Sequence, residues 1–131
     1  MPQEIETVRD FYEAVNRRDF EQAELYFHPE VEIYPAIGGE LDARRRYRGR
    51  EEGREVLEWI ADGFEVTVEI EEVIEAGSNL VLQRERWRPR GRQGIETPIE
   101  LYDLYEVEAG LIRRINGFRD REEALNAAGL A

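Results

Sequence analysis

The stretch Glu100-Leu101-Tyr102-Asp103-Leu104-Tyr105-Glu106-Val107 alternates two kinds of side chain along its length and decides the fold. Its odd-numbered residues are apolar except for Asp103, and a period of two places them on one face of a β-strand. Neighbouring runs with the same period extend over Phe64–Phe118, with turns at Gly77-Ser78 and Ala109-Gly110. Together they predict a curved, mostly antiparallel sheet with the quoted stretch at its centre.

Asp103 is the leading candidate for a functional residue, because an acid in the middle of an apolar strand face is costly unless something requires it. The turn at Gly77-Ser78 fixes the register of the first hairpin. That register places further side chains on the same inner face as Asp103: Gln83, Glu85, Trp87, Leu101 and Tyr105. We therefore expect the concave face of the sheet to carry both acids.

The second hairpin sets the surroundings of the acid. We expect Asp103 to face Ile115 across the strands, with Leu101 near Gly117. Because a glycine has no side chain, Gly117 leaves room beside the carboxylate. A curved sheet wrapped on helices, with polar groups on its inner side, predicts a cone with a small-molecule pocket at its mouth.

The outer face of the first hairpin is charged. Its expected register sets four arginines opposite polar partners: Glu71 opposite Arg84, Glu69 opposite Arg86, Thr67 opposite Arg88, and Glu65 opposite Arg90. Such cross-strand pairs contribute about 0.2 to 1 kcal/mol each and keep the face soluble. On the same face, Tyr102 and Leu104 would form an apolar patch in a monomer, so we expect a homodimer through this face.

Helical periodicity dominates the rest of the chain. Asp19 with Gln22, and Asp120 with Glu123, have the spacing of capping boxes that begin helices. In order, we expect a helix over 3–18, a second from Asp19 to His28-Pro29, a strand over 31–35, a loop over 36–50, a helix over 51–62, and a short last helix from Asp120. All of these belong to one domain, residues 1–131.

Composition excludes several classes of function. The formal charge of −12 argues against nucleic-acid binding, which depends on cations that neutralise phosphates. The chain has no cysteine, no lysine, one histidine (His28) and one serine (Ser78), so thiolate metal sites, Schiff-base cofactors and serine triads are not expected. No run approaches membrane-spanning length, and we expect a cytoplasmic protein without metal or cofactor.

The order of elements resembles the nuclear-transport-factor-2-like superfamily and, within it, the SnoaL-like group. The segments that carry the resemblance are FYEAVNRRDFEQAELYFHPEVEIYP (11–35), YRGREEGREVLEWI (47–60) and YEVEAGLIRRINGFRDREEALNAAGL (105–130). The resemblance implies an α+β cone with a curved sheet wrapped on three N-terminal helices. It leaves the activity open, because the superfamily includes isomerases, cyclases, dehydratases, epoxide hydrolases and binding domains.

The residues of known activities in the superfamily match this chain unevenly. The general base of ketosteroid isomerase-like members falls on Tyr34, and their oxyanion tyrosine falls on Phe11, with Tyr12 adjacent. Asp103 matches their second oxyanion acid, and it is also similar to the acid/base carboxylate of SnoaL-like cyclases. The two carboxylates of epoxide hydrolase-like members fall on Trp87 and Gly117, which disfavours that reaction.

Two classes of function remain open. In the first, the protein is a cofactor-free enzyme acting by proton transfer on a small hydrophobic carbonyl compound, with Asp103 as the acid/base, assisted by Glu85 and Tyr34. Its ligand-binding residues would be Phe11, Tyr12, Trp59, Trp87, Leu101, Tyr105 and Gly117. In the second, it is a non-catalytic binding or structural domain.

The second class gives both acids a structural role. Asp103 would accept a hydrogen bond from Tyr34 or Tyr12, or pair with an arginine. Glu85 would form an ion pair with Arg113 or Arg119, because a buried charge needs a partner.

Overall fold

The computed structural model describes residues 3–35, 46–63, 65–77, 79–90 and 99–130. Expected features at 36–45 and 91–98, at Ser78, and at the side chain of Trp59 lie outside the described part. The elements in chain order are α1 (Gln3–Asn16), α2 (Phe20–Glu24), β1 (Phe27–Tyr34), β2 (Tyr47–Arg48), α3 (Gly49–Gly63), β3 (Glu65–Glu75), β4 (Leu80–Arg90), β5 (Ile99–Glu108), β6 (Leu111–Phe118) and α4 (Arg121–Ala127).

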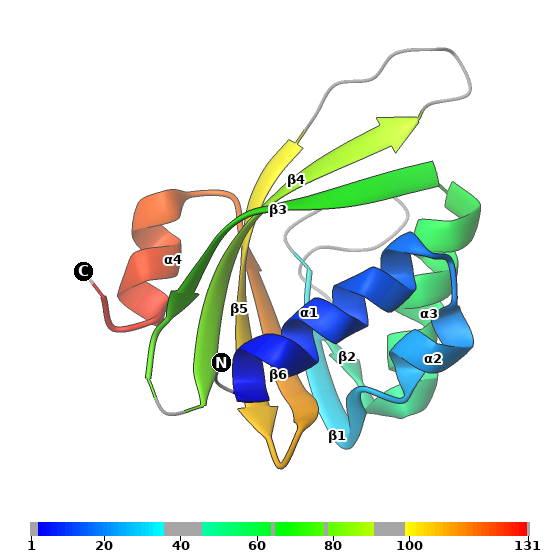
Figure 1. Cartoon of the computed structure of the whole chain (residues 1–131), viewed down its shortest axis with the longest axis horizontal. Coiled ribbons are helices and arrows are strands. Elements are labelled where there is room, and N and C mark those ends of the chain that lie inside the picture. Colours follow the sequence, from blue (N-terminus) through cyan, green and yellow to red (C-terminus); the bar gives the residue numbers. More distant parts are fainter. Residues whose placement is uncertain (1–2, 36–45, 64, 78, 91–98, 131) are drawn as a thin grey trace.

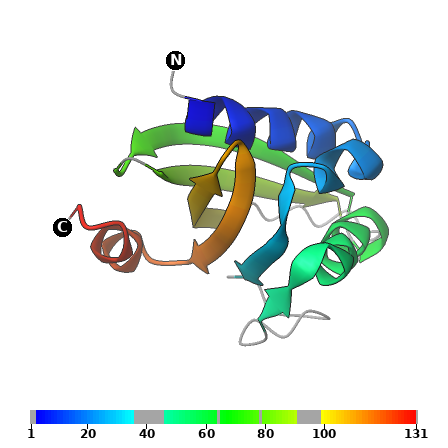
Figure 2. The ribbon, with the colours of Figure 1, turned by 90° about the horizontal axis from the view of Figure 1, so that it is seen from below.

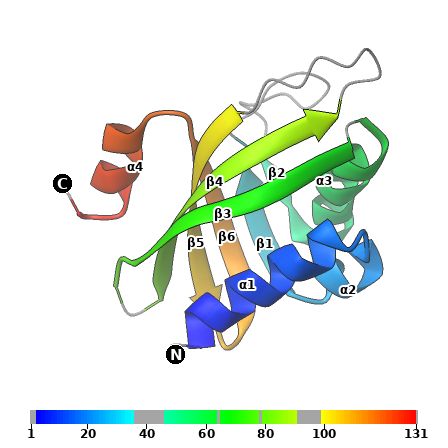
Figure 3. The same ribbon diagram turned by 45° about the horizontal axis from the view of Figure 1, so that its top comes forward.

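One six-stranded sheet forms the body of the molecule, with the strand order β2-β1-β6-β5-β4-β3. Its pairs are antiparallel except for β1 with β6, so the expected α+β fold with a mostly antiparallel sheet is confirmed. The strands twist and curve around α1, α2 and α3 on one side, while α4 lies on the other (Figures 1 and 3). Seen from below, the sheet separates α1 from α4 (Figure 2).

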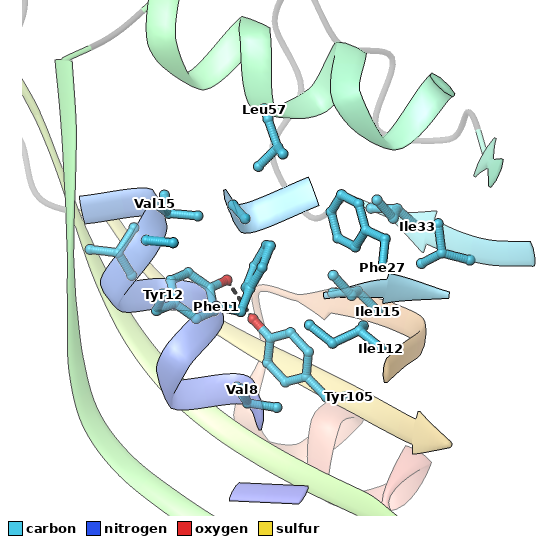
Figure 4. Packing of buried hydrophobic residues seen from close by; sticks show 14 of the residues in the cluster. Val8, Phe11, Tyr12, Val15, Phe27, Ile33, Leu57, Tyr105, Ile112 and Ile115 are labelled. Atoms are coloured by element: carbon cyan, nitrogen blue, oxygen red, sulfur yellow. Dashed lines mark hydrogen bonds between the residues drawn. The ribbon is translucent and has the colours of Figure 1, made fainter. Parts of the chain in front are cut away.

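The main core lies between the concave face and the three N-terminal helices (Figure 4). The helical spacing of Val8, Phe11 and Val15 turns one stripe of α1 onto the sheet, where all three are buried. Helix α3 approaches β1 closely at Gly53, where an added Cβ would lie 2.9 Å from the ring of Phe27. This glycine therefore sets the distance between helix and sheet.

The first strand begins earlier than expected. The sequence extended the second helix to His28-Pro29, but α2 ends at Glu24 and Phe27 already pairs with Ile112 of β6. The Ile112 amide donates to the Tyr26 carbonyl at 2.7 Å, so strand pairing overrides the helical spacing of this segment. The expected loop before α3 also contains β2, which pairs with β1.

Two bulges shift the expected registers. On β3 the residue Glu71 is extra, so Glu72 and not Glu71 lies opposite Arg84, while the other three expected pairs are correct. On β6 the residue Arg113 is extra, and this moves the partner of Asp103 by one position, from Asn116 to Gly117. The expected partner, Ile115, was wrong by a further residue, because the turn pairs Glu108 with Leu111. The arginine lattice itself is confirmed for the described side chains by ion pairs such as Arg88 with Glu69 at 2.6 Å and Arg86 with Glu71 at 3.0 Å.

The apolar patch expected on the outer face is covered. Tyr102 and Leu104 are buried in a second core with Leu82, beneath Ala124 and Ala128 of α4. The reason given for a homodimer through this patch was therefore wrong, and the dimer itself stays a prediction. No helix in the described ranges is long and apolar enough to cross a membrane.

Candidate acid/base and binding site

Two carboxyl groups meet two tyrosine hydroxyls inside the main core. Glu85 projects from β4 and Asp103 from the adjacent β5, while Tyr12 reaches them from α1. The Tyr12 oxygen lies 3.2 Å from both carboxyl groups, and the Tyr105 oxygen lies 2.8 Å from Glu85 and 3.2 Å from Asp103. The Tyr105 hydroxyl also donates to that of Tyr12 (Figure 4).

Glu85 is held from both sides on its own strand. The side-chain amide of Gln83 donates to Oε2 at 2.6 Å, and the indole N–H of Trp87 donates to Oε1 at 2.8 Å. The period of two along β4 places these three side chains on the same face. The carboxyl group of Glu85 is therefore fixed in position before any ligand arrives.

The hydroxyl protons are too few for the surrounding oxygens. Tyr12 and Tyr105 supply one proton each, yet their oxygens approach each other and both carboxyl groups. Both tyrosine oxygens bridge the two acids, and a proton on either carboxyl group would supply the missing donor. The geometry therefore favours a carboxyl pair that retains a shared proton.

The electrostatics point the same way. Burial raises the pKa of Glu85 well above its usual range, and the charge of Asp103 raises it further. Burial also raises the pKa of Asp103, although hydrogen bonds from Glu85, Tyr105 and Tyr12 oppose the shift. Burial likewise raises the pKa values of Tyr12 and Tyr105, which keeps both hydroxyls protonated as donors.

The two acids differ in their access. Glu85 is fully buried, whereas Asp103 keeps 7% of its surface exposed and lies opposite Gly117, a residue without a side chain. Phe11 packs edge-on against Tyr12, with ring centroids 5.1 Å apart, and so backs the polar cluster with an apolar wall. Asp103 is therefore the less enclosed member of the pair.

The structure gathers most of the expected site residues but separates one. Asp103, Glu85, Tyr12, Tyr105 and Trp87 form one cluster, as the shared inner face predicted. Tyr34 lies on the opposite face of β1, where its hydroxyl donates to Glu32 at 3.3 Å. It therefore cannot assist Asp103 as proposed from the sequence.

Both structural alternatives can also be compared with the coordinates. The expected hydrogen bond from Tyr12 to Asp103 is present. The suggested ion pair of Glu85 with Arg113 is not, because Arg113 contacts Glu32 and Glu108 instead. Gln83 was placed on this face but not in the site, although its spacing from Glu85 and its position opposite Asp103 were the signals for it.

No metal centre is found among the described residues, where no group of three or more acidic or histidine side chains could hold a metal ion. The cluster instead consists of proton donors and acceptors with raised pKa values. Groups of this kind can donate and accept protons, and here they lie beside an apolar wall.

Comparisons with known proteins agree with this architecture. A sequence profile described as a SnoaL-like domain matches residues 8–115. The chain is similar in structure to RV0760c from Mycobacterium tuberculosis, solved in complex with estradiol-17β-hemisuccinate, with 17% identity, a TM-score of 0.80, and coverage of 93% of this chain and 97% of that one. No match was found among curated proteins.

Two further similar structures have named ligands or activities. The epoxide hydrolase/cyclase-like enzyme SalBIII has 19% identity, a TM-score of 0.75, and coverage of 91% of this chain and 92% of that one. A computationally designed 17-OHP binder has 20% identity, a TM-score of 0.78, and coverage of 93% and 95%. At 17 to 20% identity, the similarity to these three structures establishes the fold of this chain and nothing about its activity.

Proposed function

Because the chain belongs to the SnoaL-like family, of nuclear-transport-factor-2-like fold, we propose that it binds a small hydrophobic carbonyl compound and transfers a proton to or from it at Asp103. The observation that carries the proposal is the pair of buried acids, Glu85 and Asp103, which share the hydroxyls of Tyr12 and Tyr105 and have no cation among their described contacts. Such a pair supplies an acid and a base in one place.

The roles follow from access and hydrogen bonding. Asp103, the less enclosed acid, removes a proton from a carbon next to the ligand carbonyl and later returns it to the ligand. Glu85 is a positioning residue, held by Gln83 and Trp87, that shares its proton with Asp103. Polycyclic ligands are the first class to examine, since the ligands of two similar structures are estradiol-17β-hemisuccinate and 17-OHP.

A second candidate is binding without catalysis. Each carboxyl group of the pair already has internal hydrogen-bond partners, as a satisfied polar group of a core would. In that case Asp103 only orients a ligand or the strands. The two candidates differ in whether the ligand exchanges protons with the protein.

The test measures proton exchange directly. The protein is mixed in D₂O with 17-OHP or a small cyclic ketone, and deuterium uptake at the carbons next to the carbonyl is followed by NMR. Loss of a general base slows such a step by about 10² to 10⁴-fold, so Asp103→Asn should abolish the acceleration. Glu100→Gln, which removes an exposed carboxylate on the same strand, is the matched control.

Binding is measured separately with Trp59→Phe, which leaves Trp87 as the fluorescent reporter hydrogen-bonded to Glu85. Binding with accelerated exchange supports the enzyme. Saturable binding without exchange favours the non-catalytic domain, and the absence of both across a ligand panel contradicts the proposal.

A further inference from the structure

A second charged cluster lies on the outer face of the sheet, away from the carboxyl pair. Arg48 of β2, Glu32 of β1 and Arg114 of β6 are direct neighbours across the strands. Arg46 and Arg113 flank this row, and α4 packs over β5 and β6 at the other end of the sheet. The cluster therefore faces outward at the β2–β1–β6 end.

Four guanidinium groups share the one carboxylate of Glu32. The nitrogen–oxygen distances are 3.5 Å from Arg46, 3.4 Å from Arg48, 3.5 Å from Arg113 and 3.0 Å from Arg114. Hydrogen bonding from Arg114 lowers the pKa of Glu32, so this carboxylate stays charged. Glu108, at 4.0 Å from Arg113, and Glu106, which acts on Arg114, reduce the positive excess without removing it.

The cluster has more donors than acceptors. Each guanidinium offers five N–H groups, and most of those around Glu32 approach it at the long end of the hydrogen-bond range. The Nε atom of Arg114 is buried and has no hydrogen-bond partner, as is also true of the Nε atom of Arg84 in the β3–β4 lattice, so the two regions differ in their balance of charges. In the β3–β4 lattice, by contrast, glutamates are as numerous as arginines, as with Arg86 between Glu71 and Glu100.

We propose that this Glu32–arginine cluster binds a small oxyanion, a phosphate or carboxylate group, over Arg48 and Arg114. Planar guanidinium groups match the oxygens of both anions. The arginine heads are accessible, with Arg48 and Arg114 side chains 59% and 42% exposed, while Glu32 beneath them is 9% exposed and holds them in place. The site lies on the opposite sheet face from Asp103 and does not depend on the chemistry proposed there.

The experiment titrates the full-length protein with inorganic phosphate, and separately with acetate, at constant ionic strength. NMR follows the arginine Nε–H signals and the backbone amides of β1 and β6. We expect saturable shifts at Arg48 and Arg114, with affinity about tenfold lower in Arg48→Gln and Arg114→Gln, as the loss of one charge-assisted contact predicts. Whichever anion binds more tightly identifies the chemical source of the ligand.

Two further variants make the result decisive. Arg86→Gln removes an arginine from the balanced lattice and should leave phosphate binding unchanged. Glu32→Gln removes the competing negative charge but keeps an acceptor oxygen beneath the arginines, so it should tighten binding. Arg48→Gln, at an exposed position, remains informative if the Glu32 variant does not fold. Absence of saturable shifts, or equal weakening in Arg86→Gln, would overturn the proposal.

Discussion

The pair of Glu85 and Asp103 is unusual because its surroundings can stabilise one negative charge but not two. One ionised carboxylate there is stabilised by Tyr12, Tyr105, Gln83 and Trp87, but a second would face the first inside an apolar core. Desolvation and like-charge repulsion both oppose it. A residue that a protein retains in such a place at a cost to stability is a candidate for function.

Neutralising Asp103 should therefore not weaken the fold. In Asp103→Asn, we expect the free energy of unfolding at pH 7 to be unchanged or higher by about 1 kcal/mol, since each unit by which burial raises a pKa corresponds to about 1.4 kcal/mol. Urea unfolding followed by circular dichroism measures it. The difference should vanish near pH 4, where the native wild-type carboxyl is also protonated.

A loss of several kcal/mol in this variant would contradict the interpretation, because it is the signature of a structural buried acid. The control is Glu100→Gln on the same strand. Glu100 is 46% exposed in its side chain, so its replacement should change stability by less than about 0.5 kcal/mol.

At the scale of elements, a single side chain connects α1 to the edge strand β3. The Asn16 amide donates to the Val68 carbonyl at 3.0 Å, and the Val68 amide donates back to Asn16 Oδ1 at 3.1 Å. The asparagine thus takes the place of a neighbouring strand at an otherwise open sheet edge. It also fixes α1, and with it Tyr12, relative to the sheet.

Asn16→Ala should destabilise the protein by about 1 to 3 kcal/mol, because it leaves a partly buried backbone N–H and C=O unpaired. Hydrogen exchange should accelerate at the Val68 amide more than at amides inside β5. Asn126→Ala, at an exposed position of α4, is the matched control. Equal hydrogen-exchange rates at the Val68 amide in the wild-type protein and Asn16→Ala would show that the two Asn16–Val68 hydrogen bonds do not stabilise the sheet edge.

Helix α4 protects the outer apolar core. Ala124 has no exposed surface and packs with Tyr102 and Leu104, whereas Ala127 on the same helix is exposed. Ala124→Glu should lower stability by about 2 to 4 kcal/mol through a buried charge. It should also increase self-association, seen by size exclusion with light scattering, because displacement of the helix exposes an apolar patch. Ala127→Glu should do neither.

The sequence predicted which residues share a face of each strand, but it predicted the pairing register between strands less well. The period of two located β3 to β6 and brought Glu85, Trp87, Asp103 and Tyr105 to one face. It could not reveal the extra residue Arg113 on β6, because a bulge does not change the composition of a strand.

Local sequence periodicity also could not predict which distant segments contact one another. The cover that α4 gives to Leu104 depends on the path of the chain after β6. The position of Tyr34 with Glu32 depends on where β1 starts, and strand pairing with β6 sets that start. The bonds of Tyr12 to Glu85 and Asp103 join residues far apart in the chain, and the sequence offered Tyr12 only as one possible donor to Asp103 and as a ligand-binding residue.

At the scale of the whole molecule, ionisable groups with opposite shifts should give stability a maximum in pH. The pKa of Glu32 is lowered, chiefly by Arg114, so its contribution is present above its unfolded pKa and is lost as pH falls through the folded value. The pKa values of Glu85 and Asp103 are raised. Their contribution is complete below the unfolded values, near 4, and is lost as pH rises through the folded ones.

The free energy of unfolding should therefore pass through a maximum at acidic pH and fall as the pH rises, because the native pair releases its proton and the net charge of −12 adds repulsion. Above about pH 10 the free energy of unfolding should fall further. Tyr12 and Tyr105 ionise there in the unfolded state, whereas burial keeps both protonated in the folded state. Urea midpoints between pH 2 and 11 measure the curve. In a Glu85→Gln, Asp103→Asn double variant, the decline between pH 5 and 8 should flatten while the acid limb, set by Glu32, remains. A wild-type curve that rises across that window would mean that the pair is ionised in the native state and stores no proton.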